Sequence, residues 1–328
     1  MRAVCRTSSF GVEQRQIPVP DVKPEHVVIK VSACVVNPGD KAWIAGFFPE
    51  APQSMYDVCG VTASGLVVAI GEDVPREYLG RNVAVYRSLK ASRDCVGTWC
   101  EFARLHYLNC VLLPDGINEV EYSGSLVNNI TAYVFLEQII QAGHAAVVCT
   151  AGTSATGRSL LGVCQARNFP VISLVRAESG KAALSKLGAQ HVLVTGDAGF
   201  DTQLRTLSGQ LNATAVFDGV GGVLLGRVAK LLPRGSTVYC YGFLAGAETL
   251  DFASSLLLLN SLTLTSFGIF YSPMVRDSDT LKRVLSGLQQ IIGMPHFTTS
   301  LGRAFAFEEA AEALSWQSTD GSKVVLRP

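Results

Sequence analysis

Short apolar runs separated by turn residues fill the first third of the chain. Their lengths and their content of β-branched and aromatic residues are typical of strands, which we expect over residues 27–36, 61–70, 82–87, 98–105 and 111–113. Residues 37–40 (Asn-Pro-Gly-Asp) and the proline-bounded segment 49–52 indicate loops. Pairing such strands predicts a compact, partly open β-barrel.

From residue 122 onward the pattern changes to alternating helices and strands. We expect helices over 123–142, 204–208 and 224–232, with strands over 145–150, 171–175, 215–222, 237–241 and 262–267. Between residues 145 and 194 the order is strand, tight turn, helix, strand, helix, strand. Strands that alternate with helices in this way predict a Rossmann-type, doubly wound sheet of six parallel strands.

The C-terminal tail predicts helices over 279–292 and 307–316 and a final strand over 323–326. A terminal strand needs a partner, and the N-terminal barrel is the expected host. The interpretation is a Rossmann domain at 122–267 inserted into a split barrel domain formed by 1–121 and 268–328.

The tight turn at residues 152–157 ends one apolar strand and begins an amphipathic helix. It keeps the spacing of the dinucleotide fingerprint at Gly152, Ser154 and Gly157, with Ser in place of the middle glycine. A helix N-terminus at this point of a doubly wound sheet favours a pyrophosphate, because its N–H groups and its dipole attract an anion. An ordinary strand-to-helix turn is the alternative.

The residue after the second strand indicates which dinucleotide is bound. An NAD site places an acid about 20 residues past the glycines, whereas a basic residue there accommodates a 2′-phosphate. Here Arg176 follows the strand directly, Lys181 is close behind, and Glu178 lies two positions late. The pattern favours NADPH. Solvated loop charges are the alternative for Arg176 and Lys181.

Composition narrows the function classes. Among 328 residues, Lys plus Arg equals Asp plus Glu at 27 each, so there is no electrostatic case for nucleic acid or an anionic membrane. Polar residues interrupt the longest apolar stretch, and the N-terminus lacks the apolar core of a signal peptide. The nine cysteines show no C-x-x-C pair. We expect free thiols, no metal site and a reducing, cytoplasmic location.

Several motifs occur together in one order. They are VNPGD (36–40), G-x-V-x-x-I-G (65–71), LGRNVAVY (79–86), TAY (131–133), the turn at 151–157, LGAQHV (187–192), FDGVGG (217–222), YGF (241–243) and the final SKVVLRP. This set resembles the medium-chain dehydrogenase/reductase superfamily, in its zinc-independent branch of quinone oxidoreductases and enoyl-thioester reductases. The resemblance spans nearly the whole chain and implies a GroES-like barrel beside the Rossmann domain.

The zinc-dependent relatives differ from this chain at the ligand positions. They carry Cys near Asn37, Gly-His-Glu near residues 56–58, and a four-Cys lobe. Without such ligands a catalytic zinc is not expected. Hydride transfer to a conjugated acceptor then fits better than alcohol dehydrogenation, because a delocalised oxygen needs only a few hydrogen-bond donors.

The resemblance also implies cofactor contacts. Asn37 and Thr131 would hold the nicotinamide end, Arg176 and Lys181 the 2′-phosphate, and Lys323 would reach in from the last strand. The remaining implied contacts are Gly152, Thr153, Ser154, Ala155 and Gly157 at the pyrophosphate, with Gly219, Val220, Gly242, Phe243 and Phe270 along the cleft. Some of these residues also have a purely structural interpretation. Asn37 could start a turn, both phenylalanines could be core residues, and Lys323 could be an exposed charge on a strand.

One family position is altered. Relatives carry a proton-donating Tyr in the loop after VNP, where this chain has Phe48 or, in a second alignment, Ala42. A proton must then come from Tyr56, Lys41, Tyr271 or water, and the catalytic candidates are Asn37, Tyr56 and Lys41. This departure favours quinones, whose reduced oxygen can take a proton from solvent.

The leading hypothesis is therefore an NADPH-dependent, zinc-independent reductase of a quinone or related α,β-unsaturated carbonyl. A 2-enoyl-thioester reductase is the alternative with the same chemistry. A catalytically weak, NADPH-binding or structural member of the family is the alternative from another class. The strand over 262–267 would end the sheet, and relatives pair this edge across a two-fold axis, so a homodimer is expected.

Overall fold

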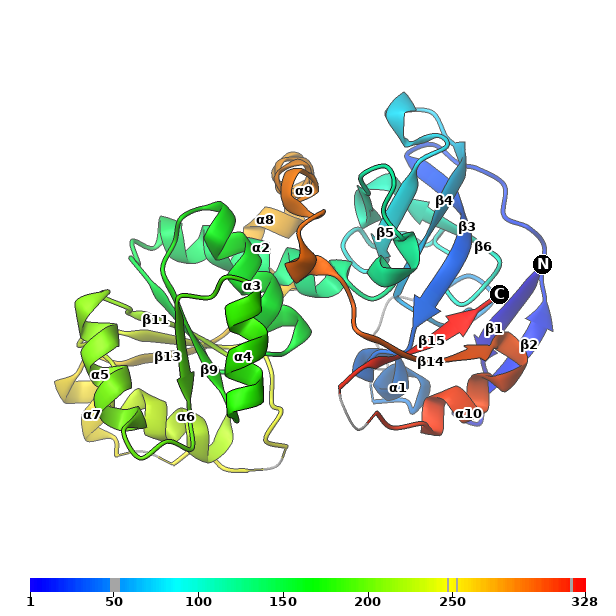
Figure 1. Ribbon diagram of the computed structural model, residues 1–328. Coiled ribbons are helices and arrows are strands. Elements are labelled where there is room, and N and C mark those ends of the chain that lie inside the picture. The colour runs from blue at the N-terminus through cyan, green and yellow to red at the C-terminus, as the bar shows by residue number, and fades with distance from the viewer. Residues whose placement is uncertain (48–53, 247, 252, 319–320) are drawn as a thin grey trace. The chain divides into compact units, whose positions relative to one another are not determined.

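The computed structural model describes residues 1–47, 54–246, 248–251, 253–318 and 321–328. The chain divides into two compact units (Figure 1). The first, here the split unit, comprises Met1–Ile130 and Pro273–Pro328. The second, here the inserted unit, is Thr131–Ser272. Each unit is described separately.

A seven-stranded sheet forms the split unit, and a two-stranded hairpin accompanies it. The sheet order is β14 (Leu301–Ala306), β15 (Lys323–Arg327), β3 (His26–Val35), β4 (Thr62–Ile70), β5 (Asn82–Tyr86) and β7 (Cys110–Leu112), with β6 (Phe102–His106) also paired to β3. The hairpin pairs β1 (Arg2–Arg6) with β2 (Val12–Gln16). The helices are α1 (Pro38–Ile44), α8 (Pro273–Arg276), α9 (Ser278–Ile291) and α10 (Ala310–Ser315).

The last strand of the chain lies beside one of the first. In Figure 1 the red β15 runs next to the blue β3, and their pairing is antiparallel, with Val325 opposite Val35. Val324, Val325 and Leu326 are buried, which explains why this short strand docks firmly. The expectation that the barrel hosts the terminal strand is confirmed.

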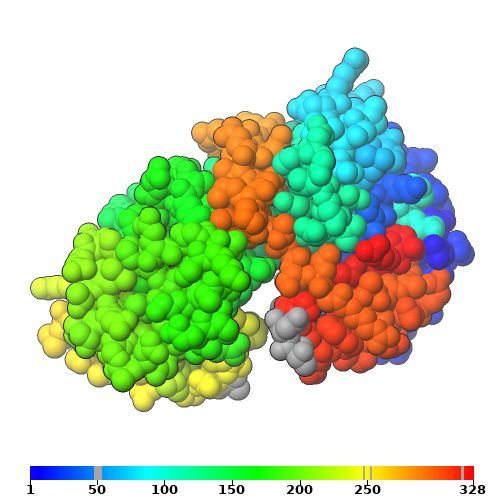
Figure 2. All heavy atoms as spheres, in the orientation of Figure 1, coloured from blue at the N-terminus to red at the C-terminus, as the bar shows by residue number. Residues whose placement is uncertain are grey.

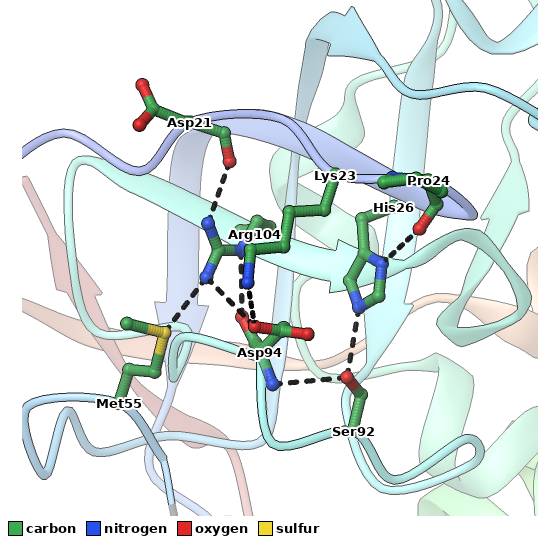
Figure 3. Close-up of polar contacts among 8 residues, drawn as sticks. All are labelled: Asp21, Lys23, Pro24, His26, Met55, Ser92, Asp94 and Arg104. Atoms are coloured by element: carbon green, nitrogen blue, oxygen red, sulfur yellow. Dashed lines mark hydrogen bonds and ion pairs between the residues drawn. The ribbon is translucent and has the colours of Figure 1, made fainter.

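A buried arginine ties the loops of the split unit together (Figure 3). Arg104 on β6 is only 4% exposed. Its guanidinium donates to the carbonyls of Asp94 and Asp21, at 2.8 Å each, and lies 2.9 Å from the Met55 sulfur. Because each partner belongs to a different loop, this one side chain fixes all three, including the loop that carries Tyr56.

Six parallel strands form the sheet of the inserted unit, as the sequence predicts. Their order is β10 (His191–Val194), β9 (Val171–Val175), β8 (Val147–Cys149), β11 (Ala215–Asp218), β12 (Thr237–Cys240) and β13 (Thr263–Ser266). The helices are α2 (Leu126–Gln141, which begins in the split unit), α3 (Ala155–Ala166), α4 (Glu178–Lys186), α5 (Phe200–Gln210), α6 (Gly222–Ala229) and α7 (Ser255–Leu259). Figure 2 shows the green segments, which include α3 and α4, at the surface of this unit.

Both faces of the central strands of this sheet are buried, as expected for a doubly wound fold. On one face Val148, Val216 and Leu174 join a large aliphatic cluster. On the other, the Phe217 ring stacks between Phe135 of α2, at 4.0 Å between centroids, and Tyr241, at 3.9 Å. The strand order changes direction between β8 and β11, which places a binding crevice at the carboxyl ends of these two strands.

Some boundaries differ from the expectations. The helix expected over 123–142 begins at Leu126, and the strand expected over 215–222 ends at Asp218, where a tight turn starts α6. The helix expected over 307–316 divides into a 3₁₀ turn, Phe307–Glu309, and α10. In the described part of the chain, no helix has both the length and the apolar character needed to cross a bilayer.

All nine cysteines are free thiols, as expected. Eight are buried, and Cys240 is partly buried. Burial raises the pKa of every one of them, to about 11 for Cys240, so at neutral pH they are protonated.

Candidate functional site

The turn between β8 and α3 is tightly packed at Gly152 and leaves no space for a side chain at Gly157. The Gly152 N–H donates to the Leu174 carbonyl of β9 at 3.0 Å, and a Cβ on Gly152 would lie 3.0 Å from the same oxygen. A Cβ on Gly157 would lie 2.1 Å from the Ala151 carbonyl oxygen. Close backbone approach therefore requires glycine at 157 and leaves little space at 152, and it brings the helix start against the strand end.

Ser154 stands at the middle position of the fingerprint and caps α3. Its hydroxyl accepts the Gly157 N–H at 3.0 Å and donates to the Ala151 carbonyl at 2.7 Å. An N-cap serine satisfies one of the helix's unpaired N–H groups and leaves the helix dipole directed at the crevice. The replacement of glycine by serine thus keeps the geometry of an anion-binding helix start.

The turn after β11 forms the other side of the crevice. The buried Asp218 carboxylate accepts the Thr150 hydroxyl at 2.6 Å and the Gly221 N–H at 2.9 Å, and the Gly219 N–H donates to the Thr150 hydroxyl at 3.1 Å. Burial raises the Asp218 pKa, while these hydrogen bonds hold it down. The expected contacts Gly219 and Val220 lie in this rigid turn.

Tyr241 is a site residue that sequence reasoning missed. A Cβ on Gly219 would lie 2.5 Å from its hydroxyl oxygen, so the phenol is directed into the crevice beside this turn. Burial raises the pKa of Tyr241, and the Ser154 hydroxyl opposes this rise. Because Ser154 caps α3, the phenol lies near the start of that helix. Gly242 is the next residue in the chain, and a Cβ on it would lie 3.0 Å from the Gly219 carbonyl oxygen. Only membership of the YGF motif could have indicated the tyrosine.

The two basic residues expected at the 2′-phosphate both follow β9. Arg176 comes directly after the strand and is exposed, and Lys181 on α4 lies 3.9 Å from Glu178. A Cβ on Gly180 would lie 3.0 Å from the Thr153 side chain, so the first turn of α4 contacts the turn at 152–157. The inserted unit thus brings the turn at 152–157 and the segment that carries the two basic residues to one edge.

Three further residues were expected to contact the cofactor, and one of them, Phe243, precedes Leu244, whose N–H donates to the Gly219 carbonyl at 3.0 Å. Phe243 is 82% exposed and Phe270 is 43% exposed, so the alternative that both are core residues is wrong. Thr131 lies on α2 and is partly buried.

Asn37 and Lys323, 286 positions apart, meet in the split unit. Asn37 caps α1, and its backbone N–H donates to the Asp40 carboxylate at 2.8 Å. Its side chain donates to the Thr62 hydroxyl at 2.9 Å and accepts the Lys323 ammonium at 2.7 Å. Asn37 therefore starts the turn into α1, as the alternative interpretation expects, and it also contacts Lys323.

The charges around Asn37 are buried and strongly perturbed. Burial raises the pKa of Asp40 from its usual 3.8 to about 6, against hydrogen bonds from Asn37 and the charges of Arg87 and Lys323. Burial lowers the pKa of Lys323 from its usual 10.5 to about 8, and Asp40 opposes this change. Burial likewise lowers the pKa of Arg87. Below, the name "buried charge cluster" refers to the charged residues Asp40, Arg87 and Lys323 together with the neutral Asn37.

Among the described residues, the side chains of the other two catalytic candidates make no hydrogen bond to the buried charge cluster, although Lys41 follows Asp40 on α1 and its N–H donates to the Asn37 carbonyl at 3.2 Å. Tyr56 is 45% exposed and occupies a tight turn closed by the Val58 N–H and the Met55 carbonyl, with φ of +60° at Tyr56 and +56° at Asp57. Lys41 on α1 donates to the Trp316 carbonyl at 3.5 Å.

Two further proton-donor positions remain. Tyr271 is 76% exposed. Phe48, the altered family position, lies outside the described residues. In the described ranges, no three His, Cys, Asp or Glu side chains are placed to hold a metal ion.

Comparison with known proteins identifies the two units. Residues 155–286 match the family described as zinc-binding dehydrogenase, and residues 23–115 match the alcohol dehydrogenase GroES-like domain. The chain is 25% identical over 257 residues to the mitochondrial enoyl-[acyl-carrier-protein] reductase of Eremothecium gossypii, covering 73% of this chain and 67% of that protein. It is 24% identical over 249 residues to the quinone oxidoreductase of Rattus norvegicus, covering 74% and 73%.

The fold also matches solved structures. A mycobacterial protein determined in complex with NADPH superposes with a TM-score of 0.75 at 23% identity, and the match covers 100% of both chains. At this identity the likeness concerns the fold.

Proposed function

Because the chain belongs to the medium-chain dehydrogenase/reductase superfamily of oxidoreductases, we propose that it is an NADPH-dependent, zinc-independent reductase. Its acceptor is a quinone or a related α,β-unsaturated carbonyl. The observation that carries the proposal is the packed glycine turn capped by Ser154, with Arg176 at the adjoining strand end.

The inserted unit fits a dinucleotide. Gly152 and Gly157 have no side chains and lie close to neighbouring backbone, so a pyrophosphate can approach the start of α3. The Arg176 guanidinium suits a 2′-phosphate. NADPH supplies a hydride when it is bound. The residues of this unit bind and orient the cofactor, and the mycobacterial relative solved with NADPH supports this assignment.

The split unit does not fit a zinc ion. The Asn37 carboxamide stands where zinc relatives have Cys, and all its polar atoms are engaged by Asp40, Thr62 and Lys323. The Lys323 ammonium and the buried Arg87 guanidinium oppose a second cation at this place. Without a Lewis acid the acceptor must itself be electrophilic, and this favours conjugated carbonyls.

The central test is cofactor selection by Arg176. Replacing it by Ala is expected to weaken NADPH binding about 10- to 100-fold, because a charge-assisted contact to the 2′-phosphate is lost. NADH affinity should change little. Fluorescence titration measures both, and Arg205→Ala, which removes an exposed arginine of α5, is the matched control. Equal losses for NADPH and NADH would contradict the role of Arg176.

The acceptor is tested by following NADPH oxidation with simple quinones, enones and enoyl thioesters. The first two are expected to react. Turnover of enoyl thioesters alone would establish the second candidate, which the similarity to the Eremothecium gossypii reductase supports. Tight NADPH binding with no turnover of any acceptor would leave the non-catalytic alternative.

We also propose that the protein is a homodimer. All four residues of the edge strand β13 are exposed, and nearby Leu258 and Leu259 of α7 are 79% and 66% exposed. The N–H groups of Thr263 and Phe267 donate toward β12. By strand alternation, the N–H of Leu264 points to the open edge, where a second copy of β13 can pair.

Light scattering is expected to give twice the 35.0 kDa chain mass. Leu264→Pro removes the outward N–H and should yield a monomer, whereas Leu264→Thr keeps the N–H and should remain dimeric. A monomeric mass for the unaltered protein would rule out this assembly.

A further inference from the structure

A cavity of about 480 Å³ lies at the edge of the inserted unit, at the amino ends of β9 and β10. Its wall includes Val171 and His191, the first residues of these two strands, together with Leu161 and Gln165 of α3. Sites that hold small molecules usually enclose about 300–1,000 Å³, so this cavity has room for a ligand built on one ring. Its whole wall belongs to one unit.

This cavity is distinct from the candidate cofactor crevice. β9 begins at Val171 on the cavity wall and ends at Val175, after which Arg176 follows. Because a strand rises about 3.3 Å per residue, the two ends of β9 are roughly 13 Å apart. The crevice lies at the carboxyl ends of the strands and the cavity at their amino ends. A ligand in the cavity therefore leaves the place of the dinucleotide open.

One side of the cavity is apolar. Leu161 and Cys164 of α3 and Val171 of β9 are buried, and Phe169 and Pro170 come from the loop that joins the two elements. Burial raises the pKa of the Cys164 thiol well above its usual 9.0, so this side carries no charge at neutral pH. A flat ring fits such a wall, because contact removes its apolar surface from water.

Four polar side chains complete the wall, those of Gln165, Asn168, Gln190 and His191. The Gln165 amide donates to the Leu187 carbonyl at 2.9 Å, which fixes its position. Within the described ranges the other three side chains make no hydrogen bond, so they are available to a ligand. Carboxamide and imidazole groups offer both donors and acceptors, which matches a carboxamide on the ligand.

The charges around the cavity disfavour an ionic ligand. Among the described residues that line it there is no Lys, Arg, Asp or Glu. α3 and α4 end beside it, at Ala166 and Lys186, and the C-terminal ends of helices disfavour anions. The neighbouring Arg167 pairs with Glu137 of α2. A ligand cation would find no carboxylate in the wall, so an uncharged ligand fits best.

We propose that this cavity binds an uncharged, planar aromatic carboxamide. The ring lies against the apolar side, and the amide exchanges hydrogen bonds with Asn168, Gln165 and His191. This inference goes beyond the proposed function and does not depend on it.

Three probes of one shape test the charge argument. Benzamide, benzoate and benzamidine are neutral, anionic and cationic at neutral pH. Ligand-observed NMR titrations are run with excess NADPH, which keeps the probes out of the cofactor crevice. Benzamide is expected to bind with a dissociation constant of about 1 mM, and the two ions about tenfold more weakly. Binding of either ion as tight as that of benzamide would overturn the proposal.

Asn168→Gly locates the bound probe. Asn168 has a φ of +50°, which glycine adopts without strain, so the variant should fold and lose only the carboxamide. Benzamide affinity is expected to fall about three- to tenfold. Asn212→Gly is the matched control, because Asn212 is an exposed asparagine of the same unit with the same φ of +50°. It should leave the affinity unchanged. Equal affinities in the Asn168→Gly and unaltered proteins would contradict this location.

The His191 ring gives a second readout that needs no turnover. The chain has five histidines, and His191→Phe identifies the ring-proton signal of His191. Benzamide should shift that signal and leave the signal of His144, whose ring contacts Thr214 and Tyr239, in place. A bound probe that does not move the His191 signal would overturn the proposal. If the protein reduces no acceptor, the proposed function fails, and these titrations still decide the inference.

Discussion

Replacing Gly157 by Ala is expected to weaken NADPH binding about 100-fold, equivalent to about 3 kcal/mol. The new Cβ would lie 2.1 Å from the Ala151 carbonyl and 2.8 Å from that of Gly152, so either the start of α3 or the turn must move. Such overpacking also lowers stability by about 1–3 kcal/mol. Fluorescence titration with NADPH and calorimetric unfolding measure the two effects.

The matched control is Gly209→Ala in α5 of the same unit. A Cβ at Gly209 would meet nothing within 4 Å, and alanine is the better helix former, so stability should be unchanged or higher by up to about 1 kcal/mol. NADPH affinity should stay the same. An unchanged affinity in the Gly157→Ala protein would contradict the assignment of the turn to the pyrophosphate.

A second large effect is expected in the pH dependence of stability of the split unit. The folded chain holds the Asp40 proton more tightly than the unfolded chain, because its pKa is about 6 instead of 3.8. Stability from this group is therefore lost as pH rises from about 4 to 6, by about 3 kcal/mol. Lys323 has the opposite effect: its pKa is about 8 instead of 10.5, so stability increases between about pH 8 and 10.5.

Calorimetry from pH 4 to 10.5 on the unaltered protein, Asp40→Asn and Lys323→Met measures the two slopes. Asp40→Asn should lose the acid slope, and its alkaline rise should begin at a lower pH, because Asp40 opposes the fall of the Lys323 pKa. Lys323→Met should lose the alkaline slope, and its acid loss should extend to a higher pH, because the Lys323 charge holds the Asp40 pKa down. Curves that run parallel to the unaltered protein between pH 4 and 6 for Asp40→Asn would show that Asp40 is not a buried, strained carboxylate.

The hydrophobic pattern predicts the inserted unit well because each of its elements is buried in a regular way. β9 (Val171–Val175) is buried at all five positions, and its expected bounds are those observed. β14 (Leu301–Ala306) was missed, because only Phe305 in it is buried and no alternation signals a strand. The exposed β2 (Val12–Gln16) was missed for the same reason.

The sequence motifs predict where the candidate site lies better than they predict its buried charges. The family resemblance named Asn37 and Lys323 separately as cofactor contacts, and in the structure the Lys323 ammonium donates to the Asn37 side chain at 2.7 Å. Arg87 gave no signal, because a charged residue in a sequence is expected at the surface, and Tyr241 was indicated only by its place in the YGF motif, because an aromatic residue is expected in the core. Their burial depends on contacts between strands that are distant in sequence.

The packing of the nine cysteines bears on the chemistry proposed for this protein. Quinones and enones are Michael acceptors that alkylate thiolates, so a reductase that concentrates them risks inactivating itself. Here the eight buried thiols are shielded, and the partly buried Cys240 is kept protonated by a pKa of about 11. The proposed reaction with soft electrophiles requires such shielding in a chain that carries nine thiols.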